Sequence, residues 1–232
     1  MSNILCSSIG KKLLMSITGL FLMIFLVIHL VLNSFLLLPD GGQLFNAAAH
    51  FMATNPGIRI MEPLLGLGFL IHIIWASILT AQNQKARGVN RYAASNNTLK
   101  VSWASKNMLV LGITIGAFLV VHIANFWVKM KITHDGMEHT TIDIAGVSTQ
   151  VENAYTLVNT TFGMLWVVIV YVVGSIGLAI HLTHGFWSAF QSMGVSNEIW
   201  RKRLTNFGYL FAWFIGIGFS LIAICQHFFF QA

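Results

Sequence analysis

Four histidines are the residues of this chain whose type and placement point most directly to chemistry. His29, His72, His122 and His181 each lie inside a different long apolar run, and these runs contain no Asp, Glu, Lys or Arg. A polar side chain in hydrocarbon is costly and is usually functional. Ion-coupled transporters and proton relays usually carry intramembrane charges, so their absence disfavours those classes. Neutral imidazole is a good ligand for iron, which makes metal ligation the favoured chemistry.

The elements that must position these histidines are membrane spans. The chain has 232 residues, of which 56% are hydrophobic and 9% are charged, whereas about 25% of residues are charged in a soluble domain. A run of about 20 apolar residues crosses a bilayer. We therefore expect an all-α integral membrane bundle of five transmembrane helices. It forms one domain over residues 1–232, with helices at approximately 12–38, 60–84, 105–129, 157–190 and 203–230.

Basic residues are distributed unevenly around these spans. Lys11 and Lys12 precede the first span, the connection from 85 to 106 is rich in Lys and Arg, and 201–203 is a basic run before the fifth span. Basic loops mark the cytoplasmic side of a membrane. The pattern predicts a cytoplasmic N-terminus and an external C-terminus, and it explains the net charge of +6 without nucleic acid. Cys6 and Cys225 then fall near opposite faces, which excludes a disulfide between them.

Two haems with two histidine ligands each would use all four histidines, because haem is held by axial side chains in an apolar slot. A helical rise of about 1.5 Å per residue places His29 and His122 roughly 24 to 26 Å from the basic residues that precede their spans. The same rise places His72 and His181 roughly 20 Å from the cytoplasmic ends of theirs. These depths pair the first two histidines at an outer level and the other two at an inner level.

Glycines near the inner pair indicate space for a flat macrocycle. Gly174 and Gly177 share a helical face with His181, and Gly68 lies one turn before His72. A turn without side chains allows close approach of a neighbouring group. Ordinary packing of small residues between membrane helices is the alternative interpretation of these glycines. His184 competes with His181 as a ligand, and the glycine face and greater depth favour His181.

The motifs together resemble one protein family. Ser16-x-Thr18-Gly19 is followed by His29 and Asn33, the second and third spans carry single histidines, and the fourth ends in HLTHGFWSAFQSMG at 181–194. This pattern resembles the cytochrome b membrane-anchor subunit of succinate:quinone oxidoreductases (succinate dehydrogenase or quinol:fumarate reductase), in the single-chain, five-helix, two-haem type. The resemblance covers nearly the whole chain. It implies that His29 and His122 ligate the outer haem b and that His72 and His181 ligate the inner one.

The resemblance also implies partners and a location. Such an anchor binds a flavoprotein subunit and an iron–sulfur subunit on the cytoplasmic side of the bacterial cytoplasmic (inner) membrane, and the whole complex is a candidate dimer. It passes electrons between a membrane quinone and the iron–sulfur subunit, with menaquinone favoured over ubiquinone here. Dicarboxylate chemistry would occur in the partners, while this chain contributes to the quinone site. The candidate docking surfaces are Lys85 to Lys106 and Glu198 to Arg203.

Further contacts follow from depth and from the resemblance. Asn33 and Asn125 lie one turn beyond the outer histidines and are candidate quinone contacts, with hydrogen bonding between helices as the alternative. The candidate contacts of the inner haem propionates are Lys12, Ser16, Trp187 and Gln191. Some fumarate-reducing relatives carry a glutamate two residues before the ligand of the fourth span. Ala179 occupies that position here, which disfavours a proton route through it.

Two other functions remain open on the sequence. One is the di-haem cytochrome b subunit of another quinone-linked enzyme, such as a nitrate reductase or formate dehydrogenase. Those subunits commonly place two ligands on one span, whereas His181 and His184 are too close together to serve two stacked haems. The other is a haem-free membrane transporter or structural scaffold.

Overall fold

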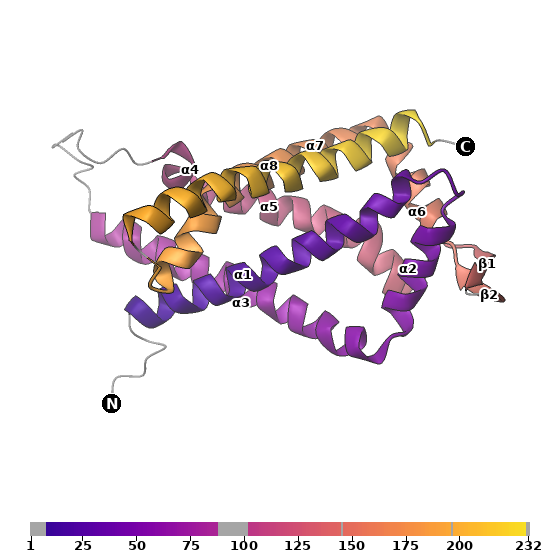
Figure 1. The fold of residues 1–232 in the computed structure, drawn as a ribbon, viewed down its shortest axis with the longest axis horizontal. Helices are drawn as coiled ribbons and strands as arrows, with labels where there is room; N and C mark the ends of the chain where they lie inside the picture. Colours follow the sequence, from indigo (N-terminus) through magenta and orange to yellow (C-terminus); the bar gives the residue numbers. More distant parts are fainter. Residues whose placement is uncertain (1–7, 88–101, 145, 196, 231–232) are drawn as a thin grey trace.

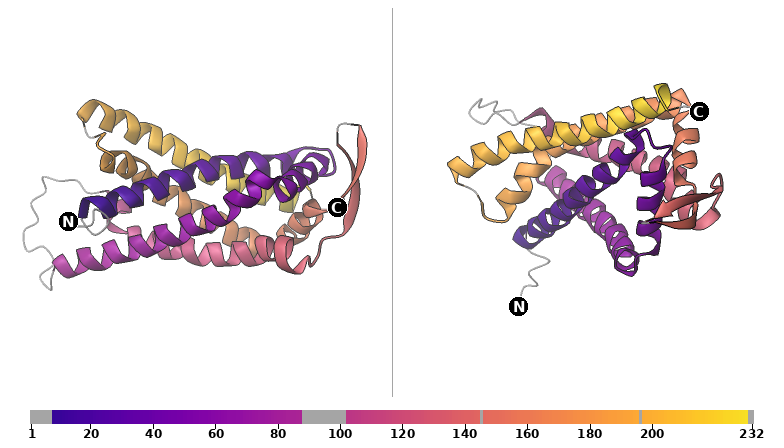
Figure 2. Two further views of the ribbon diagram at one scale, coloured as in Figure 1. Left: turned by 90° about the horizontal axis from the view of Figure 1, so that it is seen from below. Right: turned by 45° about the vertical axis from the view of Figure 1, so that its right-hand side comes forward.

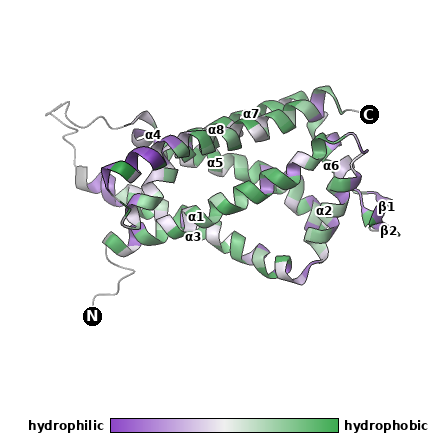
Figure 3. Cartoon of the chain, in the orientation of Figure 1, coloured by the Kyte–Doolittle hydropathy of each residue, from purple (hydrophilic) through white to green (hydrophobic). Residues whose placement is uncertain are grey.

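Five helices dominate the computed structural model, which describes residues 8–87, 102–144, 146–195 and 197–230. Within these residues, five segments are long and apolar enough to cross a membrane (Figures 1 and 3). They are Ile9–Leu37, Pro56–Lys85, Met108–Thr133, Leu165–Ser192 and Glu198–Phe228. The prediction of a helical protein with five candidate membrane spans is therefore confirmed.

The first span is α1 (Ser8–Ser34), which continues as a short 3₁₀ turn at Phe35–Leu37. The chain then forms a helix that the sequence did not predict, α2 (Gln43–Thr54). The carboxylate of Asp40 starts α2, since it accepts hydrogen bonds from the backbone N–H groups of Gly42 and Leu44, both at 2.9 Å. Free N–H groups at a helix start require such acceptors.

The second span is α3 (Pro56–Arg87), which begins four residues before the predicted start at 60. Its first residues are held by the side chain of Asn55, whose Oδ1 accepts from the N–H of Gly57 at 2.9 Å. Proline at the first helical position suits this start, because its missing N–H would have no partner there. Pro63 lies inside the helix without ending it.

The third span is built from α-helix followed by π-helix. A single turn, α4 (Trp103–Lys106), precedes α5 (Met108–His122). Directly after His122 the backbone widens into two π-helical segments, Ile123–Trp127 and Lys129–Thr133. The span therefore ends four residues beyond the predicted 129. A π-helical turn inside a span is rare and often accompanies a functional site.

The connection from 134 to 164 contains structure that the sequence did not predict. Strands β1 (His139–Ile144) and β2 (Val147–Glu152) form an antiparallel hairpin in which His139 pairs with Glu152. Helix α6 (Ala154–Phe162) follows. The buried side chain of Asn46 joins α2 to α6, because its Nδ2 donates to Asn153 Oδ1 at 3.0 Å and its Oδ1 accepts from the N–H of Tyr155 at 2.9 Å.

The last two spans are α7 (Leu165–Ser192) and α8 (Glu198–Phe228). The expectation of one helix over 157–190 is wrong at its start, because the chain breaks at Gly163–Met164 and Met164 is extended. Glycine is a poor helix former, which favours the break there. Helix α8 begins five residues earlier than the predicted 203, because the side chain of Asn197 caps it by accepting from the N–H of Trp200 at 2.8 Å.

The bundle has two ends, which we name by their residues. The basic end holds the starts of α1 and α8 and the ends of α3 and α7, with Lys12, Lys106 and Arg201–Arg203. The hairpin end holds α2, α6, β1 and β2 (Figure 2). Helix α1 begins at the basic end and α8 finishes at the hairpin end (Figure 1). Arg91 and Lys100, in the connection between α3 and α4, lie outside the described residues.

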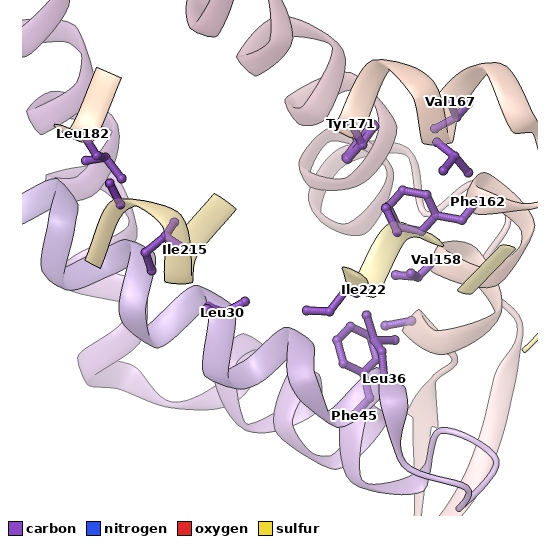
Figure 4. Close-up of a cluster of buried hydrophobic side chains, with 14 of the residues drawn as sticks. Leu30, Leu36, Phe45, Val158, Phe162, Val167, Tyr171, Leu182, Ile215 and Ile222 are labelled. Atoms are coloured by element: carbon purple, nitrogen blue, oxygen red, sulfur yellow. The ribbon is translucent and has the colours of Figure 1, made fainter. Parts of the chain in front are cut away.

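The buried core lies between α1, α7 and α8 and extends under α2 and α6 (Figure 4). Helices α7 and α8 pack closely at Gly216, where an added Cβ would lie 2.6 Å from Ala179 Cβ. Helix α3 contributes no residue to this core cluster as described. In the most apolar window of α3, and likewise of the third span, only 6% of residues are buried, against 44% for α7. We call these two spans sparsely buried.

Candidate functional site

Two of the four histidines meet near the middle of the bundle, toward its hairpin end. His29 of α1 and His122 of α5 have ring centroids 5.7 Å apart and planes at 89° to each other. A metal–imidazole bond is about 2 Å long, so two imidazoles on opposite sides of one metal have nitrogens about 4 Å apart and ring centres somewhat further apart. The observed separation of 5.7 Å is somewhat shorter than the roughly 6 Å that this arrangement gives. The predicted outer pair is therefore adjacent in space.

Aromatic rings enclose the outer pair. Phe25 stacks on His29 at 5.1 Å, and Phe219 of α8 approaches the same ring to 5.5 Å. Around His122 the ring centroids of three other residues lie within 5.8 Å: Phe118, Phe126 and Tyr171. The Nδ1 atom of His122 is buried and makes no hydrogen bond. The site is thus apolar, and it contains an imidazole nitrogen without a protein partner.

The two asparagines predicted near the outer pair both bond to protein groups. Asn33 Nδ2 donates to the backbone oxygen of His29 at 2.8 Å and lies 3.4 Å from the Nδ1 atom of the same histidine. Asn125 Nδ2 donates to the hydroxyl of Tyr171 on α7 at 3.3 Å. Asn125 therefore links two helices, and Asn33 bonds within its own helix. Both lie beside the outer pair, on its hairpin-end side.

The other two histidines lie nearer the basic end. His72 of α3 faces α1, where the hydroxyl of Thr18 lies 3.2 Å from its Nδ1 atom. The neighbouring Gly19 is also close to this ring, since an added Cβ would be 3.6 Å from His72 Cε1, an ordinary contact. His181 of α7 also lies near α1, because a Cβ added at Gly185 would be 4.0 Å from both His181 Cδ2 and Met23 Cε. The predicted inner pair therefore shares one region of the bundle, in which α1 packs against both α3 and α7.

His181 and His184 differ in their surroundings. The Nδ1 atom of His181 is buried and makes no hydrogen bond, as for His122 in the outer pair. His184 is half-buried one turn nearer the basic end. The indole Nε1 of Trp75, one turn from His72 on α3, is a third buried nitrogen without a partner. Sequence reasoning did not identify Trp75, because tryptophan is common in membrane helices and only the structure shows its buried N–H.

The glycines near the inner pair do not leave the open strip that the sequence suggested. An added Cβ at Gly174 would lie 2.5 Å from the ring of Phe118, and one at Gly68 would lie 3.1 Å from the ring of Phe21. At Gly177 it would lie 3.6 Å from Thr114 Cγ2, an ordinary contact. The interpretation of Gly174 as space beside His181 is therefore wrong. This glycine receives a ring that also packs against His122.

The predicted propionate contacts gather at the basic end. Lys12 and Ser16 lie in the first turns of α1, and Trp187 and Gln191 lie in the last turns of α7. Ser16 is buried and its hydroxyl donates to the backbone oxygen of Lys12 at 3.0 Å. Lys12 and Gln191 are exposed, and Trp187 is half-buried. The structure thus places all four on the basic-end side of the inner pair.

The donor set fits a haem better than a metal ion held by protein alone. Among residues 8–87, 102–144, 146–195 and 197–230, no three or more His, Cys, Asp or Glu side chains gather so as to hold a metal. His134, in the connection after the third span, instead pairs with Glu152 at 2.7 Å. A bis-histidine haem needs only two protein ligands and an apolar surrounding. The adjacent imidazoles of His29 and His122, with aromatic rings around them, meet that requirement.

Comparisons with protein-family models, with curated proteins and with solved structures give no match to this chain.

Proposed function

We propose that this chain is the di-haem cytochrome b anchor of a succinate:quinone oxidoreductase, and that it carries electrons between a membrane quinone and an iron–sulfur subunit. The observation that supports the proposal is the pairing of four intramembrane histidines from four helices. His29 lies against His122, and His72 and His181 both lie beside α1. The sequence motifs around these histidines resemble the same family. Bound haem iron would supply one-electron transfer at each pair.

The chain's own residues hold and insulate the two proposed cofactors. His29 and His122 would ligate the outer haem b, and His72 and His181 the inner one. The rings around the outer pair exclude water from it, which keeps the local dielectric low and strengthens the influence of nearby charges on the iron. Thr18 holds the ring of His72, and α1 connects the two levels because it carries both Thr18 and His29.

The basic end is the proposed cytoplasmic and docking side. Lys and Arg near the ends of spans remain in the cytoplasm, and this end carries Lys12, Lys106 and Arg201–Arg203. A flavoprotein subunit and an iron–sulfur subunit would dock there, with the chain in the bacterial cytoplasmic membrane. The inner histidine pair is the one nearer this side. The whole complex is a proposed dimer.

Quinone chemistry is proposed near the outer pair, with menaquinone as the expected quinone. Asn33 and Asn125 lie beside that pair and would have to exchange their present bonds, to His29 and Tyr171, for a quinone carbonyl. Ala179 is fully buried, and it lies against Gly216 of α8. Alanine cannot carry a proton. Protons released by quinol oxidation near the outer pair must therefore use a route that does not involve position 179.

An optical spectrum of the purified chain tests the proposal. We expect a Soret band and about two b haems per chain by pyridine haemochrome assay. A preparation from the native membrane without a Soret band would refute the haem proposal and favour a transporter or scaffold.

The identity of the complex is tested by purification from the native membrane under mild detergent. We expect co-purifying subunits that carry flavin and iron–sulfur clusters, and reduction of the chain's haems by succinate or by a quinol with fumarate as acceptor. Molybdenum in the co-purifying subunits would instead identify a nitrate reductase or formate dehydrogenase type of enzyme.

A further inference from the structure

Thr18 makes three short polar contacts with a single hydroxyl. Its Oγ1 lies 2.9 Å from the backbone oxygen of Leu14, 3.1 Å from that of Met15, and 3.2 Å from Nδ1 of His72. The residue is buried, with 8% of its surface exposed. A hydroxyl has one hydrogen to donate and two lone pairs that accept. Three contacts on one hydroxyl therefore restrict which atom can carry each hydrogen.

Only one assignment of hydrogens satisfies all of these contacts. The backbone oxygens of Leu14 and Met15 can only accept, so the Thr18 hydrogen must point to one or both of them. If it pointed to His72 instead, two oxygen acceptors would face each other at 2.9 Å without a hydrogen between them. Thr18 is thus an acceptor toward His72, and Nδ1 of His72 carries the hydrogen.

We propose that Thr18 is a positioning residue that fixes the Nδ1–H tautomer of His72 and thereby presents its Nε2 lone pair to the iron of the inner haem. The inference rests on the proposed function, since it assigns a role toward that haem. In a neutral imidazole one nitrogen is a donor and the other an acceptor. A hydrogen bond from the second nitrogen of a metal-ligating histidine sets its tautomer and orientation and raises its basicity as a ligand.

The location of Thr18 suits this role. The residue belongs to α1, while the histidine belongs to α3, which has no residue in the described core cluster. Apart from the proposed haem, the Thr18 contact is therefore one of few specific interactions that can orient this ring. The next residue, Gly19, also adjoins the imidazole, because an added Cβ would be in ordinary contact with its Cε1.

The test compares Thr18→Val with Thr18→Ser in the complex purified from its membrane. Thr18→Val keeps the branched shape without the hydroxyl, and Thr18→Ser keeps the hydroxyl without the methyl group. A more basic histidine stabilises the ferric state, so loss of the hydrogen bond should raise the midpoint potential of the inner haem in Thr18→Val only. The same variant should retain this haem about 10-fold to 100-fold less tightly. Its low-spin ferric electron paramagnetic resonance line should move with the potential.

The outer haem serves as the internal control. The midpoint potential of the outer haem is assigned in the His181→Ala variant, which is expected to lack the inner haem. This potential should not change in either Thr18 variant. If Thr18→Val does not accumulate, Thr18→Ala replaces it, because alanine and serine also differ by the hydroxyl.

Two results would overturn the inference while leaving the proposed function intact. One is an unchanged inner-haem potential and retention in the variants without a hydroxyl. The other is an equal change in Thr18→Ser, which would assign the effect to shape. Absence of haem from the parent protein would instead refute the proposed function itself.

Discussion

The pair α7 and α8 and the pair α3 and α5 are built by opposite means. Helices α7 and α8 pack through small residues, with Gly216 against Ala179, and 44% and 33% of the residues in their most apolar windows are buried. The spans that contain α3 and α5 bury only 6% each. Tight packing between lipid-embedded helices depends on close backbone approach. The first pair therefore builds the buried core, whereas the second pair contacts that core with only part of its surface.

Each histidine pair joins one helix of the buried core to one sparsely buried helix. His29 of α1 lies opposite His122 of α5, and His181 of α7 and His72 of α3 both lie beside α1. If haem binds as proposed, its axial bonds would attach α3 and α5 to the core. On this proposal, the sparsely buried helices are those whose position depends on the ligand. Four predictions test this difference, in order of decreasing effect.

Removal of one histidine ligand should remove one haem and increase the mobility of the sparsely buried helix at that haem. His181→Ala should lower the haem content from about two per chain to about one and should increase hydrogen exchange in α3. His122→Ala should do the same for the outer haem and α5. Haemochrome assay and hydrogen-exchange mass spectrometry measure the two effects. His184→Ala is the control and should keep both haems; a reversed result for His181 and His184 would show that the ligand is misassigned.

Gly174→Ala should weaken the binding of the outer haem, although Gly174 is on α7, the helix that carries the inner ligand His181. The new Cβ would meet the ring of Phe118 at 2.5 Å, and this ring packs against His122. Overpacking costs about 1–3 kcal/mol, so we expect roughly tenfold weaker retention of the outer haem. Competition with a haem-accepting protein measures retention. Gly177→Ala, one turn away, should have little effect; selective loss of the inner haem in Gly174→Ala would restore the idea of an open glycine strip.

Gly216→Ala and Gly66→Ala should differ because their helices are packed differently. A Cβ at Gly216 would lie 2.6 Å from Ala179 Cβ and 3.0 Å from the backbone oxygen of Ser175, whereas at Gly66 of α3 nothing lies within 4 Å. We expect Gly216→Ala to lower the free energy of unfolding by about 1–3 kcal/mol. Gly66→Ala should be neutral or stabilising, because alanine favours helix. Thermal unfolding in detergent measures both, and equal effects would contradict the difference in packing.

Glu62→Gln should weaken the polar link between α3 and the π-helical end of the third span. Glu62 accepts a hydrogen bond from Trp127 Nε1 at 2.6 Å and pairs with Lys131 at 3.0 Å. Partly exposed ion pairs contribute little, so we expect a loss of about 1 kcal/mol in unfolding free energy. Glu138→Gln, an exposed carboxylate at the same end, is the control. A stability equal to that of the parent would show that the link does not hold α3.

Prediction from the sequence was most successful where one local property dominates. Apolar length alone locates the five spans, because a bilayer accepts a helix of about 20 apolar residues almost regardless of its neighbours. It did less well at helix boundaries. Asn197 extends α8 by capping it, and Gly163–Met164 separates α6 from α7. Helix α2 and the hairpin of β1 and β2 were missed because their segments are short and mixed in polarity.

The candidate site also contains features that the sequence predicted and features that it did not. The depth of each histidine along its own helix predicted which pairs share a level, because the rise per residue of a helix is constant. The partner of each ring was not predictable. Thr18 beside His72 and Phe118 beside Gly174 and His122 come from helices distant in sequence. Such contacts depend on how the helices are rotated and spaced in the bundle.

The amino-acid sequence by itself determined that this chain is a helical protein with five candidate membrane spans and one histidine inside each of four of them. Hydropathy and helical rise are properties of a single segment, and they need no knowledge of its neighbours. The tertiary structure alone decided that His29 faces His122, that Thr18 lies beside His72, and that α3 and α5 bury few residues within the chain. These are relations between helices, and lipid-facing and protein-facing residues are equally apolar, so no pattern within one helix specifies them.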